Sequence, residues 1–140
     1  MASIFTKIIQ GEIPSYKVAE TGLFYAFLDI NPLAKGHTLV VPKNEVDYIF
    51  DVDDALYKEL FGFAKKVGLA IEGVINCKRI GMIVFGLDVP HAHIHLIPIN
   101  KSSEMNFSSP KVKLSPEEFQ EIAEKVNTKF NQTQDSELKT

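Results

Sequence analysis

Three of the four histidines in this 140-residue chain lie within five residues, at His91, His93 and His95. Side chains at every second position of a β-strand point to the same face, so the spacing predicts three imidazoles on one face. The apolar residues between them would pack on a core. Histidine changes charge near neutral pH, and neighbouring like charges disfavour protonation. We therefore expect a row of largely neutral imidazoles.

Three interpretations of this row are open. The polar face of a half-exposed antiparallel strand explains the alternation, but not why every polar position is histidine. A metal site is less favoured, because alternate residues on a strand lie about 6.6 Å apart and metal–nitrogen bonds are about 2 Å long. One ion would need a third ligand from elsewhere, and the chain has no Cys-x-x-Cys or His-Glu-x-x-His spacing. Nucleophilic catalysis by neutral imidazole is the third interpretation.

The surrounding pattern predicts an α+β fold, with an antiparallel sheet of about five strands and one long helix across a face. Strand-like segments are 16–20, 23–28, 38–41, 79–85 and 91–99. Helical spacing predicts a short N-terminal helix over 4–9, the long helix from about 54 to 74, and a short C-terminal helix after Ser115-Pro-Glu-Glu. We expect one domain over 1–131, with the motifs within 3–100, and a disordered polar tail over 132–140.

Composition excludes several other classes of protein. The chain is 45% hydrophobic and 24% charged, with a net charge of −3, as in ordinary globular domains. A dedicated nucleic-acid surface would need clustered lysine and arginine. One cysteine fits a reducing compartment, and no signal peptide or membrane-length apolar run is evident. We expect a cytoplasmic protein without nucleic-acid or membrane partners.

Segment His91–Ile97 resembles the signature of the histidine triad (HIT) family, His-φ-His-φ-His-φ-φ with φ apolar. Lys7–Ser15 is similar to the family's opening, in its branch of small nucleotide-binding proteins. Segments 26–32 and 36–43 are similar to its central part, so the resemblance covers about 3–100. It implies nucleotidyl transfer without metal or cofactor. The substrate would be a nucleoside phosphoramidate or a dinucleoside polyphosphate, hydrolysed through a nucleotidyl-histidine.

The resemblance also implies the role of each histidine. His93 would attack the α-phosphorus through its distal nitrogen, while the carbonyl of His91 accepts from its proximal nitrogen. His95 and His37 would donate to phosphate oxygens. His91 would orient its neighbours.

A nucleotide pocket is implied as well. Asp29 would accept from the ribose hydroxyls through charge-assisted hydrogen bonds. The other pocket residues that the resemblance implies are Phe5, Ile8, Phe27, Ile30, Asn31, Asp88 and Val89. The apolar residues of this set could equally belong to the ordinary hydrophobic core.

Two departures from the family pattern matter. Several bacterial members hold zinc through positions that are Ser3, Thr6 and Glu45 here, so structural zinc is not expected. Leu87 and Asp88 stand where the family often has an amide and a small polar residue. A carboxylate there would repel phosphate, which bears on rate and on the choice of leaving group.

The leading hypothesis is a purine nucleoside phosphoramidase acting on AMP–N bonds. A dinucleoside polyphosphate hydrolase would use the same catalytic residues. A nucleotide-binding module with little catalysis is a third possibility, suggested by Leu87 and Asp88. The resemblance further implies a homodimer. It does not decide whether the base of the substrate is adenine or guanine.

Overall fold

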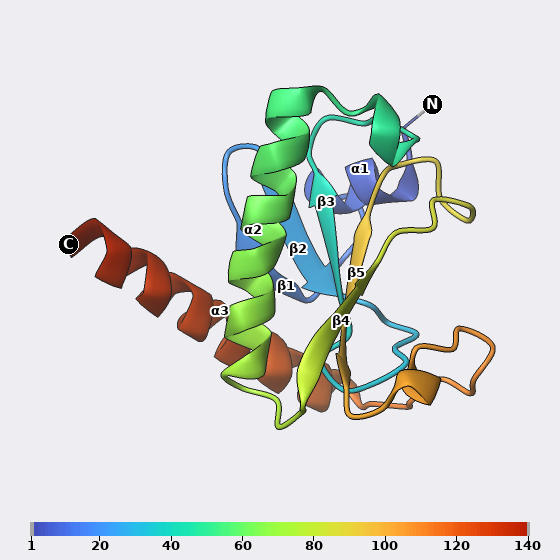
Figure 1. Ribbon diagram of the computed structural model, residues 1–140, viewed down its shortest axis with the longest axis vertical. Coiled ribbons are helices and arrows are strands. Elements are labelled where there is room, and N and C mark those ends of the chain that lie inside the picture. The colour runs from blue at the N-terminus through green and yellow to red at the C-terminus, as the bar shows by residue number, and fades with distance from the viewer. Residues whose placement is uncertain (1, 140) are drawn as a thin grey trace.

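The five strands form one antiparallel sheet in the order β1-β2-β3-β5-β4, so β5 (Ile94–Ile99), which carries His95, lies beside β3 (Thr38–Pro42) (Figure 1). The computed structural model describes residues 2–139, with side chains to residue 134. The elements are α1 (Ile4–Ile9), β1 (Lys17–Glu20), β2 (Phe24–Leu28), β3 (Thr38–Pro42), η1 (Ile49–Asp51), α2 (Asp54–Glu72), β4 (Arg79–Ile83), β5 (Ile94–Ile99), η2 (Ser102–Glu104) and α3 (Pro116–Lys139). This confirms the predicted α+β class.

Side chains of β2 and β3 alternate between two cores. Ala26, Val40 and Ile94 belong to the larger core under α2 and α3. Phe27 and Leu39 belong to a smaller core with α1 on the opposite face. Figure 1 shows α2 lying over the sheet, with its axis roughly along the strands. Because Ile94 faces α2, the histidine at position 95 faces the side of α1.

β5 begins at Ile94, so the predicted strand over 91–99 starts too early. Its register pairs Val40 with Ile94 and would next place Ala92 opposite Pro42. Proline has no N–H to donate to a ladder, and the N–H of Ala92 instead donates to the carbonyl of Val46 at 2.7 Å. His91 therefore precedes the strand. β4 likewise ends at Ile83, two residues before the predicted end.

Helix α3 begins with the predicted capping box. The Glu118 N–H donates to Ser115 Oγ, and the Ser115 N–H donates to Glu118 Oε1, both at 3.1 Å. The helix then continues to Lys139, so it is longer than the short C-terminal helix expected from the sequence. No glycine or proline follows Pro116, so nothing in the backbone stops the helix at Asn131.

None of the helices in residues 2–139 combines the length and the apolar character that a membrane span requires.

Candidate active site

All four histidines gather on the α1 side of the sheet and are buried, with 0% to 8% of their surface exposed. His95 lies on β5, while His91 and His93 precede it. His37 precedes β3, after a turn at Gly36 whose φ of +88° suits glycine. The half-exposed strand face is therefore the wrong interpretation, because water does not reach this row freely.

His93 has the geometry of a nucleophile. Its Nδ1 lies 2.8 Å from the backbone carbonyl oxygen of His91, which is the predicted contact. A carbonyl only accepts, so Nδ1 carries the proton and Nε2 keeps its lone pair. Burial lowers the pKa of His93 and keeps the ring neutral near pH 7. Phe5 packs edge-on against this ring, with centroids 4.9 Å apart.

His37 and His95 form a proton-ordered pair. The N–H of Leu33 donates to His37 Nδ1 at 3.0 Å, so the proton of His37 sits on Nε2. That Nε2 lies 3.0 Å from His95 Nδ1 and donates to it. His95 consequently carries its own proton on Nε2. Its ring centroid is 5.0 Å from that of His93, so this N–H lies on the ring next to His93.

The resemblance implies that His37 donates to a phosphate oxygen, whereas in this structure its Nε2–H is engaged with His95 Nδ1 and fixes the tautomer of His95. Burial, together with a smaller contribution from the neighbouring imidazole, lowers the pKa of His37 to about 3 and that of His95 to about 4. Both rings are neutral at pH 7.

Asp29 lies at the end of β2, where its backbone N–H donates to the carbonyl of His37 at 2.9 Å. Its Oδ2 is 3.6 Å from His37 Nε2, and its Oδ1 accepts from the backbone N–H of Asn31 at 2.9 Å. Burial raises the pKa of this carboxyl, against the Asn31 hydrogen bond and Lys111. Asn31 thus closes a local turn, and among the described residues no hydrogen bond joins its exposed side chain to a histidine.

Neither candidate metal cluster fits a resident ion. Ligand atoms of Asp29, His37 and His95 lie within 4.8 Å of one another. The Leu33 N–H, however, fixes the proton of His37 on Nε2, the atom that an ion would need. Around His91, Ser3, Thr6 and Glu45 stand where the family resemblance places two cysteines and a histidine, and they offer hydroxyl and carboxylate oxygens instead. Zinc prefers sulfur and imidazole nitrogen at structural sites, so the set does not suit it.

The predicted pocket residues divide into two groups. Phe5, Ile8 and Phe27 are buried in the smaller core, with Val89 packed against it, and Phe5 alone contacts His91 and His93 by its ring. Ile30 is 67% exposed and does not join this core.

Asp88 and Leu87 lie in the loop before the histidines. Asp88 is exposed but close enough to raise the pKa of His93 against the stronger effect of burial. Leu87 is 87% exposed, so it is not part of the core.

Phe107 is a site residue that the sequence did not indicate. Its ring packs edge-on against His95, with centroids 4.9 Å apart, and against Phe85 at 4.7 Å. It also lies 6.1 Å from the ring of His37. The residue belongs to the loop after β5, which has no apolar periodicity, so no signal pointed to it.

Comparison with known proteins agrees with the geometry. The model of the HIT domain matches residues 10–102. The adenosine 5′-monophosphoramidase of Schizosaccharomyces pombe is 37% identical over 133 residues, covering 93% of this chain and 99% of that protein. A Hit-like protein from Bartonella henselae has a structure with a TM-score of 0.80 and 30% identity, covering 91% of this chain and 95% of the other.

A second solved structure, a hypothetical histidine triad nucleotide-binding protein from Sulfolobus tokodaii, has a TM-score of 0.78 at 25% identity. It covers 91% of both chains. The histidine row, the fold and the family match point the same way. This chain belongs to the HIT family.

Proposed function

We propose that this protein is a nucleotide-binding hydrolase that cleaves the P–N bond of nucleoside phosphoramidates through a nucleotidyl intermediate on His93. The contact of 2.8 Å between His93 Nδ1 and the carbonyl oxygen of His91 carries the proposal, because it leaves Nε2 unprotonated. The name of the Schizosaccharomyces pombe relative, an adenosine 5′-monophosphoramidase, supports AMP as the nucleotide part.

The reaction takes two displacements at phosphorus. In the first, the Nε2 lone pair of His93 forms a bond to the α-phosphorus as the P–N bond breaks, and the amine leaves with a proton from solvent. In the second, water attacks the same phosphorus, the P–Nε2 bond breaks, and the proton of the water returns to solvent. The products are AMP and the amine, with His93 restored.

The neighbouring residues stabilise charge on the phosphoryl group and orient the sugar. The Nε2–H of His95 donates to a phosphate oxygen, where a positioned donor is most effective in a site that excludes water. His37 holds that donor in place through Nε2 at 3.0 Å. The partly buried carboxylate of Asp29 accepts from ribose hydroxyls.

Two alternatives remain to be separated from this proposal by experiment. Dinucleoside polyphosphates would use the same residues, so comparing the rates on the two substrate classes distinguishes the two activities. A binding module with little catalysis is favoured by the exposed Leu87 and by Asp88, whose carboxylate disfavours phosphate nearby. AMP affinity without turnover of either substrate would support it. The purine base, the homodimer and the cytoplasmic location stay predictions.

The decisive experiment uses the substitution His93→Gly with adenosine 5′-phosphoramidate. Turnover should disappear while AMP binding persists, and added imidazole should restore part of the rate by occupying the vacated space. Mass spectrometry of the quenched wild-type reaction should find a nucleotide adduct on His93. Retained activity in His93→Gly without imidazole would disprove the covalent route.

A further inference from the structure

The ring of His91 is held at both nitrogens by groups that the reaction does not use. Its Nε2 lies 2.8 Å from the carbonyl oxygen of Pro42, which can only accept, so this nitrogen carries the proton. In the neutral ring, Nδ1 then accepts from Ser3 Oγ at 2.7 Å. The hydroxyl of Ser3 also accepts from the N–H of Thr6 at 3.1 Å, where it caps α1. The helix cap and the histidine therefore share one hydroxyl.

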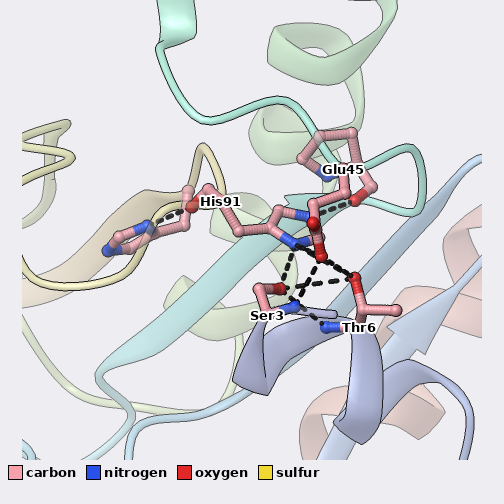
Figure 2. Close-up of polar contacts among 6 residues, drawn as sticks. Ser3, Thr6, Glu45 and His91 are labelled. Carbon is pink, nitrogen blue, oxygen red and sulfur yellow. Dashed lines mark hydrogen bonds and ion pairs between the residues drawn. The ribbon is translucent and has the colours of Figure 1, made fainter. Parts of the chain in front are cut away.

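Glu45 completes this cluster (Figure 2). Its Oε1 accepts from the N–H of Ser3 and from the hydroxyl of Thr6, each at 2.6 Å, and lies 4.0 Å from His91 Nδ1. These hydrogen bonds, the one from Thr6 first, lower the pKa of Glu45 to about 2. The carboxylate is thus ionised throughout the physiological range and fastens the start of α1 to the segment after β3.

The residue after Glu45 holds the other side of His91. The N–H of Ala92 donates to the carbonyl of Val46 at 2.7 Å. That N–H and the carbonyl of His91 belong to the same planar peptide unit and point in opposite directions. Fixing the N–H on Val46 therefore aims the carbonyl oxygen of His91, which is the oxygen that accepts from His93 Nδ1.

We infer that Glu45, together with Ser3 and Thr6, positions His93 by immobilising the ring and the following peptide of His91. The inference rests on the proposed function, and it assigns these three residues an indirect part in the reaction. A looser His91 carbonyl would let the proton of His93 move to Nε2, the atom that must attack. The same cluster also seats Phe5, between Ser3 and Thr6, against the ring of His93.

Substitutions at two positions test the cluster. Glu45→Gln removes the charge and keeps the size of the side chain. Thr6→Val keeps the shape and removes the hydroxyl, whereas Thr6→Ser keeps the hydroxyl. Glu12→Gln is the matched control, because Glu12 is exposed and lies just after α1.

The expected result separates chemistry from binding. In Glu45→Gln and Thr6→Val, kcat for adenosine 5′-phosphoramidate should fall about tenfold, by analogy with the outer-shell partners that orient metal-binding histidines. The dissociation constant for AMP should change less than twofold. Thr6→Ser should restore most of kcat, and Glu12→Gln should match the wild type.

Nitrogen-15 chemical shifts of the His93 ring give a second readout that needs no turnover. Wild type should be in the Nδ1–H form, and the two disruptive variants should gain the Nε2–H form. An unchanged kcat with an unchanged His93 tautomer would overturn the inference, even if thermal unfolding shows a loss of stability. Should Glu45→Gln fail to fold, the Thr6→Val and Thr6→Ser pair decides. Absence of wild-type turnover would count against the proposed function alone, because the tautomer still tests this cluster.

Discussion

Mild acid should destabilise this fold, because its histidines are buried as neutral rings. Burial lowers the pKa of His95 from 6.5 to about 4 and that of His37 from 6.5 to about 3. Between those values and 6.5, the unfolded chain binds more protons than the folded chain. The contribution of these histidines to the free energy of unfolding is therefore complete above pH 6.5, and it is lost as the pH falls toward the folded pKa. The lowered pKa of His93 acts in the same direction.

The size of the loss follows from linkage. For His95, the two pKa values give a loss of about 2 kcal/mol between pH 7 and pH 5. His37 gives about the same, so the pair removes about 4 kcal/mol. Domains of this kind have roughly 5–15 kcal/mol in total. Carboxylates such as Glu45 act mainly below their ordinary pKa of 4.5, outside this interval.

Urea titrations followed by circular dichroism at several pH values, at constant ionic strength, would measure the loss. The substitution His37→Asn should roughly halve the dependence on pH, since it removes one of the two titrating rings and can still donate to His95. A free energy of unfolding that is constant within about 1 kcal/mol from pH 7 to pH 5 would refute this account of the pair. So would proton NMR titration of both rings near pH 6.5.

Three further outcomes are expected. Phe107→Ala should admit water to His95 and raise its pKa toward the ordinary value, which NMR titration would detect, whereas Phe107→Leu should change it less; an unchanged pKa in Phe107→Ala would show that the ring does not shield the pair. Asp29→Asn should bring the kcat/KM values for ribose and 2′-deoxyribose substrates within about threefold of each other, because the charged acceptor is worth about 1 kcal/mol or more for the hydroxyl; a preserved preference would remove Asp29 from sugar recognition. Prolonged dialysis against a chelator should leave both turnover and the thermal unfolding temperature unchanged, and a loss of turnover that zinc restores would reverse the conclusion drawn from the Leu33 hydrogen bond.

Patterns that repeat along the chain were enough to predict most of the fold. Alternation predicted that Ala92, Ile94 and Leu96 face a core, and all three belong to the core under α2. The three- and four-residue spacing predicted α2, and the capping box at Ser115 marked the start of α3. Each of these signals arises from neighbours in sequence.

Features that depend on contacts between distant segments could not be predicted in this way. The start of β5 is set by Pro42, on another strand. The role of His37 depends on the N–H of Leu33, a backbone group with no sequence signature. In the sequence, Ser3 and Glu45 stand out only as departures from the expected zinc ligands. Their hydrogen bond of 2.6 Å joins residues 42 positions apart, and no local pattern predicts it.

The late start of β5 has a chemical consequence. Inside a sheet, a backbone oxygen is shared with the adjoining strand, and its direction is dictated by the ladder. Because β5 begins only at Ile94, the backbone oxygen of His91 is not part of a ladder. It can therefore accept from Nδ1 of His93, two residues further on. The point at which β5 begins therefore helps to set which nitrogen of His93 carries the proton.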